Sequence, residues 1–221
     1  MFLNCNFKIR NILLVFIMII GICFKFICLA HDISQEYLYY FCSEEISFEL
    51  KEFMTGRSFK ENNNIISFDD LRYVRVLYWG IDDEIHEGEM VVNRDVAEDV
   101  IDIFKELFNK KYKIYQMKLL DCYGADYRKS LADNNTISFY MSDSCNSLEE
   151  KYHSLGLAID INPLFNDFLF KEESKMNTLE EIICDKIVIN DKDDCYNAFT
   201  SRKWTWDGDI GNNCKCFFKE K

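Results

Sequence analysis

One run, from Tyr152 to Pro163, constrains this chain more than any other segment. It reads Tyr-His-Ser-Leu-Gly-Leu-Ala-Ile-Asp-Ile-Asn-Pro and places His153 and Asp160 seven residues apart, with Gly156 between them. A histidine in a loop followed by an aspartate on a strand can bring two donor atoms to one ion, and both side chains are good zinc ligands. The spacing alone is weak evidence, because a capped turn before a strand, with a loop histidine bonded to backbone, gives the same pattern.

The length and composition predict one folded domain. The chain has 221 residues, which is enough to bury a core of useful size, and 48% of them are hydrophobic. A disordered chain has far fewer apolar residues. With one proline and eight glycines, the sequence offers no linker rich in these residues.

Residues 1–30 differ from the rest of the chain. Lys8 and Arg10 precede an apolar run from Ile12 to Phe24, and Cys28-Leu29-Ala30 then offers small residues where a signal peptidase cuts, which is typical of a secretory signal peptide. A retained membrane anchor is the alternative, because the stretch from Ile12 to Ala30 is about long enough to span a bilayer, although Lys25 interrupts it. The expected location is therefore secreted or extracytoplasmic, with contact to a membrane only if this segment is retained.

The chain is acidic, with a formal net charge of −12. The first thirty residues hold three basic and no acidic side chains, so their removal makes the remainder more negative. Such a surface repels nucleic acid and anionic lipid. We therefore expect no nucleic-acid partner, and cationic molecules or peptides held by local contacts fit better.

Seven cysteines follow residue 30. Exported thiols meet oxidants and tend to pair, and an odd count leaves one that is free, intermolecular or metal-bound. We expect Cys214 or Cys216 to form a disulfide. The seven are Cys42, Cys122, Cys145, Cys184, Cys195, Cys214 and Cys216.

Periodicity predicts an α+β domain, because strands alternate with separate amphipathic helices. Residues 31–66 are expected to be an accessory helical segment, and residues 67–221 the main domain. The predicted helices are 34–54, 94–109 with Asn93 as the cap, 178–187 and 194–203; the predicted strands are 71–79, 89–92, 134–142, a central strand at 157–161, 204–206 and 215–218.

Three ordered blocks together resemble the VanY-like D-alanyl-D-alanine carboxypeptidases, whose signature is Ser-x-His-x-x-Gly-x-Ala-x-Asp-x-Asn-Pro. The blocks are residues 86–93, residues 123–136, and the His153–Pro163 run with Trp204-Thr205-Trp206 and Gly208-Asp209 downstream. The resemblance implies a hedgehog/DD-peptidase fold, in which helices pack on a small antiparallel sheet. It also implies zinc-dependent cleavage of bacterial cell-wall peptides.

The resemblance further implies a ligand set of His, Asp and a second His, with an acidic general base three positions before that second His. His153 and Asp160 match the first two ligands. Aligning the closing motif with residues 214–219 puts Phe217 at the second histidine and Cys214 at the base. Phenylalanine cannot bind zinc and a thiol is a poor base, so we expect an incomplete zinc site and an impaired enzyme. Cys216, or Cys214, is the candidate replacement ligand.

Other positions differ from the family as well. Lys151 stands where the family has Ser, and Ser142 stands where many members have Arg. Asp207 and Ile210 stand where the family has Gly and Trp. The family's cleft maps onto residues 133–136 and 204–206. Three hypotheses remain open: an active zinc peptidase with a cysteine ligand, an inactive domain that binds a peptide or partner, and a disulfide-held structural domain. The residues expected to line the substrate cleft are Asp133, Asn135, Thr136, Trp204 and Trp206.

Overall fold

The structure is a computed structural model that describes residues 37, 39–142, 147–164, 166, 189–210 and 216–220. The chain separates into two units, Met1–Tyr39 and Tyr40–Lys221, and the following account concerns the second. The expected signal segment and the expected helix at 178–187 lie outside the described residues. Within the described ranges, no helix has the length and apolar character needed to cross a membrane.

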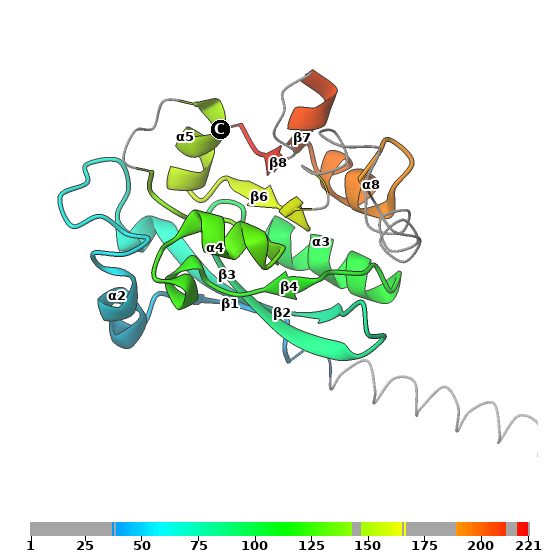
Figure 1. The fold of residues 1–221 in the computed structure, drawn as a ribbon, viewed down its shortest axis with the longest axis horizontal. Coiled ribbons are helices and arrows are strands. Elements are labelled where there is room, and N and C mark those ends of the chain that lie inside the picture. The colour runs from blue at the N-terminus through cyan, green and yellow to red at the C-terminus, as the bar shows by residue number, and fades with distance from the viewer. Residues whose placement is uncertain are drawn as a thin grey trace, which may run out of the picture. The chain divides into compact units, whose positions relative to one another are not determined.

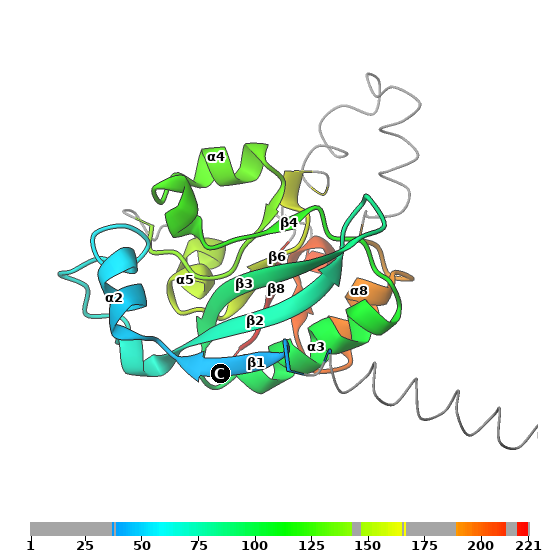
Figure 2. The same cartoon turned by 90° about the horizontal axis from the view of Figure 1, so that it is seen from below.

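The first sheet is antiparallel, with strand order β1-β2-β3. It comprises β1 (Cys42–Glu45), β2 (Leu71–Trp79) and β3 (Ile85–Asn93). The predicted strand at 71–79 is confirmed. Helix α3 (Ala97–Asn109) packs against β1 and β2 (Figure 2). It buries a stripe at helical spacing, formed by Val100, Ile103, Phe104 and Leu107.

The expectation of one helix over residues 34–54 is wrong within the described residues. Residues 42–45 instead pair with β2, with Cys42 opposite Arg75 and Glu45 opposite Arg72. The helix is limited to α2 (Phe48–Met54), where the Ser47 hydroxyl caps the start by accepting from the backbone of Leu50. Strand pairing thus outweighs the helical pattern of the local sequence.

Short elements connect the first sheet to the site. Strands β4 (Gln116–Met117) and β5 (Asn135–Thr136) form a parallel pair. Between them lie η2 (Leu120–Tyr123) and α4 (Tyr127–Ala132). The strand expected over 134–142 is therefore short, although Ile137 continues it as a bridge to Asp160.

A second antiparallel sheet has the strand order β6-β8-β7. It comprises β6 (Ala158–Asp160), β8 (Cys216–Phe218) and β7 (Thr205–Trp206), which is followed by η3 (Asp207–Ile210). The three strands predicted here are confirmed. Strand β8 is the middle one of the three, and β6, predicted to be central, also has a backbone partner on its other side, in the bridge between Asp160 and Ile137. Helix α5 (Leu148–Ser154) packs against both β6 and β8 (Figure 1).

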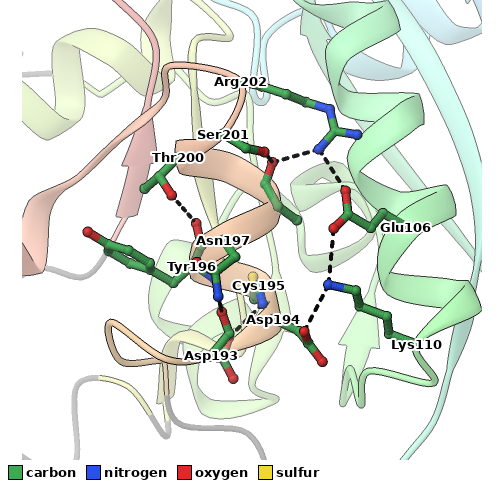
Figure 3. A network of polar contacts seen from close by, with 11 residues as sticks. Glu106, Lys110, Asp193, Asp194, Cys195, Tyr196, Asn197, Thr200, Ser201 and Arg202 are labelled. Atoms are coloured by element: carbon green, nitrogen blue, oxygen red, sulfur yellow. Dashed lines mark hydrogen bonds and ion pairs between the residues drawn. The ribbon is translucent and has the colours of Figure 1, made fainter.

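Helix α8 (Asp194–Thr200) lies against α3. Figure 3 shows the polar contacts between them: Arg202 and Lys110 both pair with Glu106, at 2.9 and 3.1 Å, and Lys110 also reaches Asp194 at 2.9 Å. The described part of the chain thus combines helices with small, mostly antiparallel sheets, as the α+β prediction requires.

Candidate metal centre

His153 lies in the last turn of α5 and is fully buried. Its Nδ1 meets the carbonyl oxygen of Ser138. A carbonyl can only accept, so Nδ1 carries the proton and Nε2 is directed at the site. A histidine ligand is usually oriented in this way by a bond at its other nitrogen.

Asp160, at the end of β6, is the second member of the site. Its Oδ1 lies 3.2 Å from Nε2 of His153. Burial by itself would lower the pKa of His153, but the charge and hydrogen bond of Asp160 outweigh that effect and the pKa is raised. The other oxygen, Oδ2, is buried and has no hydrogen-bond partner among the described residues. A buried carboxylate oxygen without a partner is costly, and a cation between the two side chains would satisfy it.

Cys216 is the third member, although it lies 56 positions after Asp160 and 63 positions after His153 along the chain. In the sheet, β8 pairs with β6 so that Cys216 stands directly opposite Asp160. Donor atoms of His153, Asp160 and Cys216 all lie within 4.8 Å of one another. Burial raises the pKa of the Cys216 thiol, and the charge of Asp160 raises it further. A thiol of this kind is protonated until a metal ion displaces the proton.

These three side chains fit a zinc ion. Imidazole nitrogen, carboxylate oxygen and thiolate sulfur are its usual protein ligands, and the unpartnered Oδ2 of Asp160 supplies a further lone pair. The site is nearly closed to solvent, since the exposed fractions of His153, Asp160 and Cys216 are 0%, 2% and 1%.

Phe217, which the sequence alignment put at the second histidine position, does not stand beside Asp160 in the structure. Phe217 pairs with Ile159, and neighbouring residues on a strand point to opposite faces. Its ring stacks on Phe199 of α8, with ring centres 4.1 Å apart. Cys216 therefore fills the position next to Asp160, and the residue three positions earlier is Asn213, which lies outside the described residues.

The turn between His153 and β6 is fixed by the first sheet. Gly156 has a φ of +66°, and a Cβ there would lie 2.6 Å from the backbone nitrogen of Asn93. That nitrogen donates to the carbonyl of Gly156 at 2.8 Å, and the Asn93 side chain donates to the carbonyl of Leu155 at 2.9 Å. The glycine of the motif is thus required by a close approach of two backbones.

Asn93 does not cap α3 as expected, because Val96 holds that position.

A cleft of about 510 Å³ lies beside the cluster. Tyr140 connects the two, since it lines the cleft and its ring stacks on His153 at 4.7 Å. The cleft has basic side chains, Arg57 and Lys60, and acidic ones, Glu149 and Glu150. Nothing in the sequence singled out Tyr140 or Ser138, because their contacts with His153 depend on the tertiary fold.

Three residues expected to line a substrate cleft have structural contacts. Asn135 and Thr136 are fully buried. The Asn135 side chain bonds both backbone groups of Lys118, at 2.7 and 3.0 Å, and the Thr136 hydroxyl accepts from the backbone of Asn162 at 3.3 Å. Asp133 is exposed and accepts from Gln116 and Tyr123, at 2.8 and 2.9 Å. None of the three lines the cleft described above.

The two tryptophans lie on the other side of the second sheet from the cluster. The ring of Trp204 meets Phe199 edge to face at 5.4 Å, and that of Trp206 lies 6.4 Å from Phe217. Both are buried. Their contact with a ligand stays a prediction.

The described cysteines Cys42, Cys122, Cys195 and Cys216 are free thiols. The disulfide expected for Cys214 or Cys216 therefore does not involve Cys216 in this structure, and Cys214 lies outside the described residues. The odd cysteine count left a free, an intermolecular or a metal-bound thiol, and the neighbouring donors of Cys216 favour the metal-bound state.

Residues 146–212 match the family model described as D-alanyl-D-alanine carboxypeptidase. The matched stretch contains His153, Asp160 and both tryptophans, and it ends before Cys216. It confirms the resemblance over a minority of the 221 residues. No curated protein and no solved structure matches the chain.

Proposed function

We propose that this chain carries an exported zinc-binding domain of the VanY-like type, with the hedgehog/DD-peptidase fold. In this proposal it binds peptides of the cell-wall class and cleaves them poorly or not at all. The observation that carries the zinc site is the cluster of His153, Asp160 and Cys216, whose donor atoms lie within 4.8 Å of one another. Cys216 takes the role of the second histidine, so the ligand set is complete in number.

The proposed loss of activity rests on the general base. In the family this is an acid three positions before the second histidine. Counted back from Cys216 the position holds Asn213, and counted back from Phe217 it holds Cys214. Neither side chain can take a proton at neutral pH as a carboxylate does. A missing general base lowers the rate by about 10²–10⁴-fold.

A bound zinc ion would supply polarisation of a peptide carbonyl and activation of water. The chain's own residues would hold it: His153 with its proton fixed on Nδ1 by Ser138, Asp160 from β6 and Cys216 from β8. The burial of all three favours a site to which water has little access.

The cleft beside Tyr140 supports peptide binding. Its volume of about 510 Å³ suits a short peptide segment, and it offers both basic and acidic side chains. Arg57 and Lys60 bring positive charge to the cleft, and Glu149 and Glu150 bring negative charge, which suits the charged ends of a peptide. The acidic balance of the whole chain argues against nucleic acid as the ligand.

An active zinc peptidase with a cysteine ligand is the second candidate, favoured by the same three-donor cluster. The two candidates differ in turnover and not in metal content. A hydrolysis assay with peptides ending in D-Ala-D-Ala distinguishes them, provided the zinc content is measured on the same sample.

The decisive experiment measures zinc content and affinity in tag-free protein and in two cysteine variants. We expect one equivalent of zinc in the wild type and a loss of affinity of about 100-fold or more in Cys216→Ala. Cys195→Ala is the matched control, because Cys195 is also a buried free thiol but belongs to α8. A wild type without zinc, or equal affinity in both variants, would refute the proposed site. Rapid cleavage by the wild type would refute only the proposed loss of activity.

A further inference from the structure

The cleft beside Tyr140 is lined by side chains of opposite charge from two separate parts of the chain. Arg57 and Lys60 follow α2 and form its basic wall. Glu149 and Glu150 belong to α5 and form its acidic wall. Across the described ranges, no ion pair joins a residue of one wall to a residue of the other. A ligand in this cleft of about 510 Å³ therefore meets charges of both signs.

The guanidinium of Arg57 is held in place at the basic wall. It stacks over the ring of Phe53, 4.9 Å from the ring centre, and its Nη1 donates to the carbonyl oxygen of Phe53. Although acidic residues outnumber basic ones by 38 to 26 in the sequence, Arg57 has no carboxylate partner within the described residues. A guanidinium presents a planar fork of donors that matches a carboxylate. Arg57 is thus oriented to receive an anionic group from a ligand.

A buried aspartate fixes the turn that carries Arg57. Both the backbone nitrogen and the hydroxyl of Ser58 donate to Asp121, at 3.1 and 2.8 Å. The carbonyl oxygen of Ser58 accepts from the backbone of Met141 at 3.0 Å. Ser58 and Asp121 are both buried. The basic wall is therefore built before any ligand arrives, and such preorganisation lowers the cost of binding.

The acidic wall is also fixed by contacts of its own. The two carboxylate oxygens of Glu150 accept from the hydroxyl of Ser142 at 2.9 Å and from the backbone of Ser147 at 3.3 Å. A carboxylate can accept about four hydrogen bonds in all, so these contacts do not exhaust it. Glu149 adds a second negative charge to the same side of the cleft. An ammonium group is the ligand chemistry that suits this wall.

The rest of the lining is largely apolar and comes from residues that precede α5. We propose that the cleft binds a short peptide with both ends free, whose carboxylate lies at Arg57 and whose ammonium group lies at the acidic wall. This inference rests on the peptide binding proposed above, and it narrows the ligand to zwitterions of about two or three residues with small apolar side chains. The apolar lining residues are Leu120, Ala125, Tyr127, Tyr140 and Met141.

The two walls also fix the direction in which the peptide lies. With the ends exchanged, the carboxylate would meet the glutamates and the ammonium group would meet Arg57, and like charges brought together oppose binding. A peptide that has lost one charged end keeps the attraction of one wall only. Peptides attached through their amino end to a larger molecule should therefore bind less tightly than free ones.

The test is a calorimetric titration of the full chain with free trialanine, N-acetyl-trialanine and trialanine amide. We expect each blocked end to lower the affinity by about 10-fold. Arg57→Gln should lower the affinity for free and acetylated trialanine by about 10-fold and leave that for the amide unchanged. Glu149→Gln should lower the affinity for the free peptide and the amide by about 3-fold, because Glu150 remains, and spare the acetylated peptide.

Arg72→Gln is the matched control. The Arg72 guanidinium also donates to backbone carbonyls, those of Asp69 and Leu71, but it does not line the cleft. This variant should bind all three peptides as the wild type does.

The outcomes separate this inference from the proposed function. Equal affinity of the wild type for the three peptides refutes recognition of the ends and leaves peptide binding in place. Absence of binding for all three refutes peptide binding itself, whatever the zinc content of the same sample. An equal loss for free and amidated trialanine in Arg57→Gln would show that Arg57 acts through the fold. Should that variant fail to fold, the three affinities of the wild type still decide.

Discussion

The two faces of the second sheet are built from alternate residues of the same short strands, and two adjacent rows of residues, one on each face, differ in chemistry. On one face, Ile159, Phe217 and Trp206 form a row across β6, β8 and β7. Helix α8 covers it, with Phe199 stacked on Phe217 at 4.1 Å. On the other face, Asp160 and Cys216 form the next row, and α5 covers it with His153.

Both rows are buried to the same degree, with exposed fractions of 0% for Phe217 and 1% for Cys216. Burial of the aromatic row is favourable by itself, since it removes apolar surface from water. Burial of the polar row, which is Asp160 and Cys216, is not favourable by itself, because Asp160 keeps one oxygen without a hydrogen-bond partner within the described structure. Burial of the aromatic row therefore stabilises this sheet by itself, while burial of the row of Asp160 and Cys216 is explained by a ligand.

The largest effect is expected at Phe217. Phe217→Ala removes a ring that is stacked between strand and helix, and should lower the free energy of unfolding by about 3–5 kcal/mol. Phe217→His should be destabilising too, and should bring no gain in zinc affinity, because position 217 faces α8. Urea denaturation and zinc competition measure the two quantities. Tighter zinc binding by Phe217→His would mean that Phe217 and not Cys216 faces the donors.

A smaller effect is expected at Gly156, which connects His153 to β6. Gly156→Ala introduces an unfavourable φ, at about 1–2 kcal/mol, and a Cβ placed 2.6 Å from the backbone of Asn93. The total loss in unfolding free energy should exceed about 2 kcal/mol, and zinc affinity should fall because His153 moves.

Gly124→Ala is the control for that variant. Gly124 has the same φ of +66°, but an added Cβ meets no atom within 4 Å. It should show the conformational penalty alone and leave zinc affinity unchanged. Equal losses of unfolding free energy and zinc affinity in Gly156→Ala and Gly124→Ala would show that the contact with Asn93 does not position His153 over Asp160 and Cys216.

Much of the fold follows from sequence periodicity. The strand at 71–79 and the helix that follows β3 have clear patterns of apolar residues, and both are confirmed. The helix expected over 34–54 failed at residues 42–45, because the edge of β2 offers them backbone partners that no local pattern reveals. Tertiary pairing often outweighs local propensity in this way.

The site was predicted in part for a similar reason. His153 and Asp160 come from one continuous motif, and the structure brings them to 3.2 Å. The third donor comes from β8, and the sequence Cys-Lys-Cys-Phe-Phe over residues 214–218 has two cysteines and two phenylalanines that allow more than one alignment. Only the register of β8 against β6 distinguishes Cys216 from Phe217, since a shift of one residue exchanges the two faces.

A still smaller effect is expected at Asn93, which joins the polar face to the first sheet. Asn93→Ala removes the hydrogen bond from its side chain to the carbonyl of Leu155 and leaves that part-buried carbonyl without this donor. The loss should be about 1–3 kcal/mol, measured by urea denaturation, and below that of Gly156→Ala. A larger loss than for the glycine variant would mean that the side chain, and not the backbone contact, holds the turn.

The smallest effect is expected at the ion pairs behind the aromatic face. Glu106 pairs with Arg202 and Lys110, and these contacts, Arg202 first, lower the pKa of Glu106 below its ordinary value of 4.5. Because its pKa is lowered in the folded state, ionised Glu106 contributes to the free energy of unfolding at any pH above its ordinary pKa. This contribution is lost as the pH falls through the lowered pKa. Because the side chains are about one-third exposed, solvent screens the pairs and Glu106→Gln should cost less than about 1 kcal/mol at pH 7. The difference from wild type should shrink as the pH falls below 4.5 or as salt is added. A loss comparable with that of Phe217→Ala would mean that ion pairs, and not stacked rings, hold α8 on the sheet.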